Sequence, residues 1–263
     1  MFRRRAATKE APTGRTAGDD ALTLHGVGRT YRKGGFVALH PVDLTVPRGR
    51  FLAVMGPSGS GKSTLLQCAA GLDRPTSGTV CVEGVPLGSL SEAQLTRLRR
   101  ERVGFVFQAH NLVPSLSVAE NVALPLLLGG ATGDAYDAAS RALAAVGLAD
   151  RTGDRPTELS GGQQQRVAIA RALVTDPAVV FADEPTGALD PETAHGVLSL
   201  LRQAVDVDGH TVVMVTHDPG AAAWCDQALF LARGRFVAVL DRPDAEQVHQ
   251  VMRRLGREAA VAA

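Results

Sequence analysis

A glycine-rich segment carries the most specific chemistry in this chain of 263 residues. Glycines let successive backbone N–H groups converge on phosphate oxygens, and a helix beginning near Gly61 would point its positive end at the same place. Lys62 is expected to contact the β- and γ-phosphates of a nucleotide, and Ser63 to give an oxygen to Mg²⁺. The segment fits the phosphate-loop pattern Gly-x4-Gly-Lys-Ser/Thr with the residues Gly56, Pro57, Ser58, Gly59, Ser60, Gly61, Lys62, Ser63 and Thr64.

Lysine is rare in this chain, which makes Lys62 more informative. The only lysines are Lys9, Lys33 and Lys62, among 28 basic residues. A compact ammonium group suits a phosphate loop better than the planar fork of arginine does. A flexible glycine loop without function is the competing interpretation. However, the segment follows the apolar run 51–55 and precedes a helical pattern, as a phosphate loop requires, and this context favours nucleotide binding.

Two adjacent carboxylates, Asp183 and Glu184, follow the apolar residues 179–182. A buried strand seldom ends in adjacent acids unless a positive group lies there. Asp183 is expected to hold the Mg²⁺ shell, directly or through water. Glu184 is expected to polarise a water in line with the γ-phosphate. An acidic strand end is common by itself, but together with the phosphate loop it predicts a site that hydrolyses nucleotides.

A second anion site is predicted at residues 159–163, Leu-Ser-Gly-Gly-Gln. Ser160 would cap a long helix, while Gly161 and Gly162 permit close approach of an anion, with Gln163 following them. This motif and the run 164–173 resemble the signature sequence of ATP-binding-cassette (ABC) proteins. The resemblance implies that the motif contacts the γ-phosphate of ATP on a facing subunit, so that two ATP molecules are held in a head-to-tail dimer.

Four further positions match motifs of the same family and take their expected roles from that resemblance. Tyr31 would stack on adenine. Gln108 would contact Mg²⁺ and the attacking water and would form the hinge of a helical lobe. Asp190, at the end of the motif 187–190, would reach across the dimer. His217 would act as the switch histidine that positions water together with Glu184 and Gln108.

The resemblance extends over about residues 21–240 and points to a subfamily. Residues 71–78, 111–128 and 184–187 are similar to those of the macrolide-exporter and lipoprotein-release ATPases. That similarity implies a separate membrane permease and conversion of the ATP cycle into mechanical motion. The chain departs from these relatives at its N-terminal extension and at Arg50, where they commonly carry an acid, and these departures leave the partner and the substrate open.

Hydrophobic periodicity predicts the elements that must position these residues. Strands are expected at 22–26, 42–46, 51–55, 79–82, 103–107, 179–182, 211–215, 229–231 and 236–240. Helices are expected at 63–70, 118–128, 136–146, 163–173, 192–204 and 245–255. Alternating short apolar strands and helices indicate an α/β fold with a mainly parallel sheet. The family resemblance identifies this fold as a P-loop NTPase with an antiparallel β subdomain and a helical signature subdomain.

The expected organisation is a single ATPase domain with short additions. Residues 1–20 read as a disordered extension, 21–240 as the ABC ATPase domain with its helical subdomain at about 109–175, and 241–263 as a C-terminal helix and tail. No apolar stretch approaches the roughly 20 residues needed to span a bilayer. The protein is therefore expected at the cytoplasmic face of the plasma membrane, attached through its permease.

Composition separates the main interpretation from two others. The net charge of +1 gives no pull toward nucleic acid. A soluble ABC ATPase acting on DNA or ribosomes would also be expected to carry long coiled coils or a second cassette, which this chain lacks. An ATPase of a non-transporting envelope regulatory or cell-division complex remains the alternative. Because one chain supplies one phosphate loop and one signature, a second ATPase subunit is required.

Overall fold

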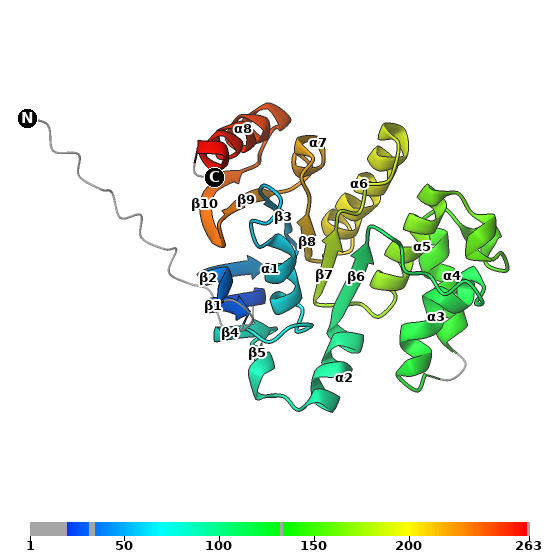
Figure 1. The fold of residues 1–263 in the computed structure, drawn as a ribbon. Coiled ribbons are helices and arrows are strands. Elements are labelled where there is room, and N and C mark those ends of the chain that lie inside the picture. Colours follow the sequence, from blue (N-terminus) through cyan, green and yellow to red (C-terminus); the bar gives the residue numbers. More distant parts are fainter. Residues whose placement is uncertain (1–19, 32–34, 132–133, 262–263) are drawn as a thin grey trace, which may run out of the picture.

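The computed structural model describes residues 20–31, 35–131 and 134–261, which form two sheets surrounded by helices (Figure 1). Its strands are β1 (Asp20–Tyr31), β2 (Phe36–Pro47), β3 (Phe51–Met55), β4 (Ser77–Val82), β5 (Val85–Pro86), β6 (Val103–Phe107), β7 (Val179–Asp183), β8 (Val212–Val215), β9 (Gln227–Ala232) and β10 (Arg235–Asp241). Its helices are α1 (Lys62–Ala69), α2 (Glu92–Arg102), α3 (Val118–Leu128), α4 (Asp134–Ala145), α5 (Gly161–Leu173), α6 (Pro191–Asp206), α7 (Pro219–Ala222) and α8 (Ala245–Val261).

The central sheet has the strand order β10-β9-β3-β8-β7-β6. Its strands are parallel except for β10, which pairs with β9 in an antiparallel hairpin. The register pairs Phe107 with Asp183, Asp183 with Val215, and Val215 with Val54. The carboxyl ends of four neighbouring strands, β3, β8, β7 and β6, therefore meet at one edge of the sheet. This topology confirms the predicted α/β fold with a mainly parallel sheet.

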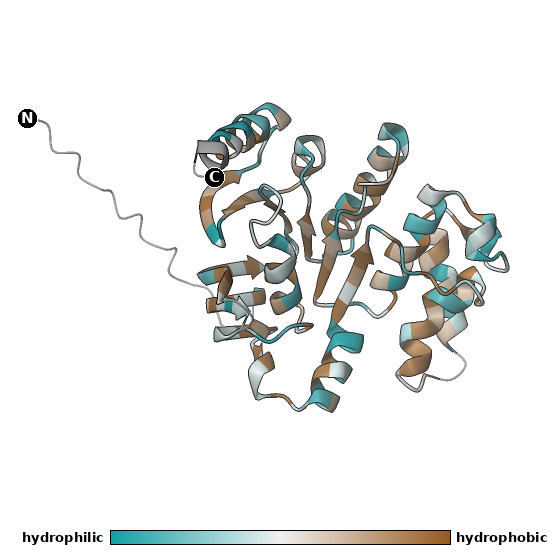
Figure 2. Ribbon diagram, in the orientation of Figure 1, coloured by the Kyte–Doolittle hydropathy of each residue, from teal (hydrophilic) through white to brown (hydrophobic). Residues whose placement is uncertain are grey.

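Two hydrophobic cores cover the two faces of the central sheet. Because side chains alternate along a strand, Phe51 and Ala53 of β3 enter one core, whereas Leu52 and Val54 enter the other. The first core contains α3 to α8, and the second contains α1 and the antiparallel sheet β2-β1-β4-β5. In Figure 2 the central strands are largely hydrophobic, whereas α8 shows a mostly hydrophilic surface. Helices α1 and α5 thus lie on opposite faces of the central sheet.

Three helices, α3, α4 and α5, gather at the right of Figure 1, beyond β6. The contact between α5 and β6 is close: a Cβ atom built on Gly104 would lie 2.5 Å from the carbonyl oxygen of Ala172. A larger residue at position 104 would separate the strand from the helix. Gly104 therefore allows α5 to pack directly on the strand that ends at Gln108.

Most predicted elements are confirmed, and two helices, α2 and α7, were not predicted. The strands 51–55 and 103–107 and the helix 118–128 agree residue for residue. Helix α7 has only four residues, and in α2 only Leu95 is buried, so the sequence of α2 has little apolar periodicity. The start of α2 is nevertheless encoded locally, because Ser91 and Gln94 form a capping box.

The ends of the chain allow only a partial comparison with the predicted segments. The proposed extension 1–20 lies outside the described residues apart from Asp20, which begins β1. The C-terminal helix continues to Val261, six residues beyond its predicted end. Within the described ranges, none of the helices combines the length and the apolar character that crossing a bilayer demands.

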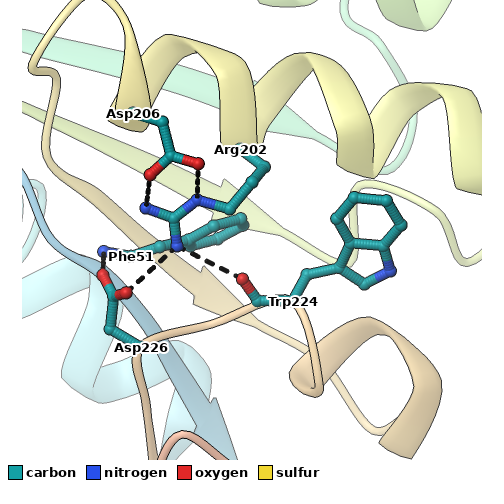
Figure 3. Close-up of polar contacts among 5 residues, drawn as sticks. All are labelled: Phe51, Arg202, Asp206, Trp224 and Asp226. Carbon is teal, nitrogen blue, oxygen red and sulfur yellow. Dashed lines mark hydrogen bonds and ion pairs between the residues drawn. The ribbon is translucent and has the colours of Figure 1, made fainter.

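Arg202 of α6 ties together three segments that are distant in the sequence (Figure 3). Its guanidinium donates two hydrogen bonds to Asp206, at 2.9 and 2.6 Å, and one of 3.2 Å to Asp226. A further hydrogen bond of 3.3 Å goes to the carbonyl oxygen of Trp224. Asp226 in turn accepts the backbone N–H of Phe51 at 2.8 Å. The cluster therefore joins α6 to the start of β3 and to the segment between α7 and β9.

We expect Arg202→Met to destabilise the fold by about 1–3 kcal/mol, because two carboxylates and a carbonyl each lose the hydrogen bonds that Arg202 donates. Urea-induced unfolding measures the change. Arg97→Met is the matched control, since Arg97 forms an exposed ion pair with Glu101 within one helix. Equal unfolding midpoints for both variants would contradict a structural role for the Arg202 cluster.

Candidate active site

The phosphate loop follows β3, and its shape depends on two glycines. Gly56 has a φ of 149°, and a Cβ atom there would lie 2.0 Å from the carbonyl oxygen of Leu231. Gly61 has a φ of 106°, and a Cβ atom would lie 2.4 Å from the carbonyl oxygen of Ala38. Both positions combine a left-handed backbone with close contact to another backbone, which only glycine tolerates. The loop is thereby fixed against β9 and β2.

Lys62 begins α1, and its side chain folds over the loop. Its Nζ donates hydrogen bonds to the carbonyl oxygens of Gly56 (2.8 Å) and Pro57 (3.0 Å). Burial lowers the pKa of Lys62, whereas the negative charges of Glu184 and Asp183 act to raise it. The ammonium group is therefore within electrostatic reach of Glu184, the predicted catalytic carboxylate, and of Asp183, the predicted Mg²⁺ ligand. Ser58, Gly59 and Ser63 are exposed, Thr64 is half-buried and Ser60 is buried.

Asp183 and Glu184 lie at the end of β7, beside the ends of β8 and β6. The backbone N–H of Glu184 donates to the carbonyl oxygen of Val215 at 2.9 Å, which holds the turn against β8. Burial raises the pKa of Asp183, and the neighbouring charge of Glu184 raises it further, while Lys62 opposes the shift. Two negative groups in a half-buried position make this edge of the sheet suited to a cation.

Glu184 and His217 form the closest pair of predicted catalytic side chains. Nδ1 of His217 lies 2.9 Å from both carboxylate oxygens of Glu184. Because an ionised carboxylate only accepts hydrogen bonds, Nδ1 carries the hydrogen in this pair. Glu184 also has a φ of 48°, an uncommon conformation for a non-glycine residue. The backbone and His217 together therefore set the direction of the Glu184 carboxylate.

Gln108 reaches the same edge from the end of β6. A Cβ atom built on Gly187 would lie 3.0 Å from Nε2 of Gln108 and 3.5 Å from Cβ of Glu184. The absence of a side chain at Gly187 thus leaves room for Gln108 beside Glu184. The structure brings Gln108, Glu184 and His217 together, from the ends of three adjacent strands.

The signature segment begins α5 with a capping box, as expected for Ser160. Its hydroxyl accepts the N–H of Gln163 at 3.3 Å, and the side chain of Gln163 accepts the N–H of Ser160 at 2.9 Å. Ser160 and Gly161 are exposed, whereas Gly162 is buried. A Cβ atom on Gly162 would lie 2.2 Å from Cγ2 of Thr193, so this glycine lets α5 pack against the start of α6.

We expect Gly162→Ala to destabilise the protein by about 1–3 kcal/mol, because the new methyl group would overlap Thr193 and force the two helices apart. Gly161→Ala is the matched control: its methyl group would meet only Leu189, at 3.8 Å, and its unfolding midpoint should stay near that of the wild type. Thermal unfolding of both variants tests this difference, which an unchanged Gly162→Ala protein would refute.

Asp190 caps α6 within its own chain. Its carboxylate accepts hydrogen bonds from the backbone N–H groups of Glu192 (3.1 Å) and Thr193 (3.0 Å). Hydrogen bonding with Thr193 lowers the pKa of Asp190. The residue is exposed, and its predicted reach across a dimer stays a prediction.

Tyr31 lies at the end of β1, in a cluster that the sequence analysis did not identify. Its hydroxyl donates to Asp73 at 3.2 Å, and the guanidinium carbon of Arg29 lies 4.7 Å from the ring centroid. Arg29 also forms an ion pair with Asp73 at 2.7 Å. One face of the ring is therefore covered by Arg29, and a base would have to stack on the other. Only the tertiary structure reveals this cluster, since Asp73 is 42 residues from Tyr31.

The phosphate loop and the signature segment of one chain do not converge. The loop leads into α1 and the signature leads into α5, and these helices lie on opposite faces of the central sheet. In the sheet, β8 and β7 also lie between β3, which leads into the phosphate loop, and β6, on which α5 packs. If both segments contact one nucleotide, as predicted, they must come from different chains.

Comparison with known proteins places this geometry in a family. The ABC transporter family model matches residues 39–187. The chain is 48% identical over 218 residues to the lipoprotein-releasing system ATP-binding protein LolD of Bordetella pertussis, covering 82% of this chain and 94% of that protein. It is 47% identical over 224 residues to the macrolide export ATP-binding/permease protein MacB 1/2 of Paracoccus denitrificans. That match covers 84% of this chain but only 33% of the relative, so the chain spans about a third of the MacB protein.

A solved structure shows the same fold. The dimeric post-hydrolysis state of the ATP-binding cassette MJ0796, bound to ADP and Pi, has a TM-score of 0.77 and 40% sequence identity with this chain. The match covers 84% of this chain and 98% of that structure. MJ0796 is an ABC transporter ATP-binding protein of Methanocaldococcus jannaschii. The sequence identities, the family match and the shared fold show that this chain belongs to the ABC transporter family of ATP-binding proteins.

Proposed function

We propose that this chain is the ATP-hydrolysing subunit of a membrane ABC transport complex, acting as a dimer that holds two ATP molecules between its chains. The observation that carries the proposal is the convergence of the phosphate loop, Glu184, Gln108 and His217 at the carboxyl ends of four adjacent strands. The signature segment, on the other face of the sheet, would bind the γ-phosphate held by the second chain. The dimeric ADP-bound relative supports this arrangement.

The donor set at the strand ends fits a magnesium ion. Mg²⁺ prefers oxygen ligands and usually binds through one or two carboxylates plus the phosphates of its substrate. Asp183 and Glu184 place two carboxylates near one lysine, and burial, followed by the charge of Glu184, raises the pKa of Asp183. Ser63, Asp183 and Gln108 would hold the ion, directly or through water. Its chemistry would be to neutralise charge on the β- and γ-phosphates.

Hydrolysis then follows from the side chains at this edge. A carboxylate oxygen of Glu184 would accept a proton from water as the water oxygen attacks the γ-phosphorus and the bond to ADP breaks. His217 would hold the Glu184 carboxylate through its Nδ1–H, and Gln108 would orient the water. Lys62 would move from its own loop carbonyls to the phosphates, while Tyr31 stacks on adenine.

A groove beside α5 is the proposed contact for the permease. It has a volume of about 330 Å³ and lies between β6, α2, α3 and α5. Phe105, Phe107 and Pro125 give it an apolar lining, and Arg100 and Arg171 add positive charge. A short amphipathic segment with an acidic side chain suits this surface. Attachment there would hold the chain at the cytoplasmic face of the plasma membrane.

Purification of the tagged chain from membranes of its own cells tests this proposal. We expect an integral membrane protein to co-purify and to change the rate of ATP hydrolysis. A partner that changes hydrolysis but moves no solute in vesicles would favour the alternative, an envelope regulatory or cell-division complex. Recovery of the chain without any membrane protein, from gently solubilised membranes, would contradict both versions.

A further inference from the structure

The loop that follows Gln108, residues 109–117, is held by two side chains from the helices beyond β6. The first is Asn121 of α3, whose side chain is fully buried. Its amide oxygen accepts the N–H of Val113 at 2.7 Å, and its NH₂ group donates to the carbonyl oxygens of Val113 (3.0 Å), Leu116 (3.2 Å) and Ser117 (3.0 Å). One side chain thus forms hydrogen bonds with four backbone groups in the second half of the loop.

The second side chain is Arg171, near the end of α5. Its guanidinium donates to the carbonyl oxygens of Asn111 (2.6 Å) and His110 (2.8 Å). Both acceptor residues have left-handed backbones, with φ of 51° and 58°, which turns these carbonyls toward α5. Burial lowers the pKa of Arg171. A half-buried guanidinium on two backbone carbonyls fastens the first half of the loop to α5.

These contacts leave a very short connection between the sheet and the helices. Phe107 is paired with Asp183 in the sheet, and His110 is already bound to Arg171. Only Gln108 and Ala109 lie between, and both are exposed. Gln108 therefore sits where a movement of the helices relative to the sheet must be absorbed by the backbone.

We propose that Arg171 and Asn121 are positioning residues that make the loop 110–117 move with α3 and α5, so that a displacement of Ser160 reaches Gln108. Ser160 and Arg171 are separated by about 16 Å along one continuous helix, at 1.5 Å per residue. Binding of a phosphate at the N-terminus of α5 would thereby adjust the side chain that orients the attacking water. This inference rests on the proposed role of Gln108 in ATP hydrolysis.

The test is Arg171→Met, which keeps an unbranched apolar stem in place of the arginine stem but removes the guanidinium and its donors. We expect kcat for ATP hydrolysis to fall about tenfold, with KM and the affinity for ATP changed less than about twofold, because Lys62 and Tyr31 are untouched. Arg171→Lys retains one charged donor, so its kcat should fall only about threefold, which is half of the tenfold loss on a logarithmic scale. Arg151→Met is the matched control: Arg151 pairs with Asp154 in the segment between α4 and α5, and its replacement should leave kcat unchanged.

A double-mutant cycle separates positioning of Gln108 from a general structural effect. In a Gln108→Ala background, Arg171→Met should lower kcat by less than about twofold, since the residue that it positions is gone. A full tenfold effect in that background, or wild-type kcat in Arg171→Met, would overturn the inference. If Arg171→Met fails to fold, Arg171→Lys takes its place in the cycle. An unchanged kcat in Gln108→Ala alone would instead refute the proposed role of Gln108.

Discussion

Glu184→Gln is expected to retain ATP binding while lowering hydrolysis by about 10²- to 10⁴-fold, the usual contribution of a general base. The amide has nearly the same shape as the carboxylate, and its oxygen can still accept a hydrogen bond from Nδ1 of His217. In the wild-type structure Nδ1 lies 2.9 Å from the Glu184 carboxylate oxygen. The amide cannot accept a proton from water, however. Binding should therefore survive the loss of turnover. Steady-state hydrolysis and calorimetric titration with ATP measure the two quantities.

The same variant also tests the dimer. If hydrolysis normally separates the two chains, the Glu184→Gln protein should accumulate as an ATP-dependent dimer in size-exclusion chromatography. Glu246→Gln, on the exposed surface of α8, is the control and should behave like the wild type in both assays. Normal turnover in Glu184→Gln would remove Glu184 from its proposed role. A monomer with bound ATP and no turnover would count against the paired-chain arrangement.

Lys62→Ala should instead lose nucleotide binding. Two charge-assisted hydrogen bonds to phosphate oxygens, each worth about 1.5–3 kcal/mol, correspond to at least about a hundredfold in affinity. The fold should survive, because the side-chain hydrogen bonds that Lys62 donates stay within its own loop, at the carbonyl oxygens of Gly56 and Pro57. Titration with a fluorescent ATP analogue measures the affinity, and circular dichroism verifies the fold.

Two comparisons sharpen the Lys62 experiment. Lys62→Arg should also bind ATP poorly, because the planar guanidinium does not fit a loop shaped around a compact ammonium group. Arg97→Ala, which removes an exposed positive charge from α2, should bind ATP normally. Unchanged affinity in Lys62→Ala would refute the assignment of residues 56–64 as the phosphate loop.

Local sequence determined the parts of the site that depend on neighbouring residues. The phosphate loop needs Gly56 and Gly61 at fixed spacing because their backbones are left-handed. The Ser160 cap depends on a partner only three residues away. The apolar runs 51–55, which is fully buried, and 103–107, which is mostly buried, became strands with those bounds because a buried strand is visible as a short apolar segment.

Tertiary structure alone decided which distant residues meet. The hydrogen bonds of Arg171 span about 60 residues, and those of Arg202 to Asp226 span 24, so no periodicity predicts them. The sequence did not predict helix α2, because Leu95 is its only buried side chain and leaves no apolar periodicity. The placement of α1 and α5 on opposite faces of the sheet was likewise set by packing of the two cores. Short-range patterns specify turns, caps and buried strands, whereas contacts between distant side chains exist only after the chain has folded.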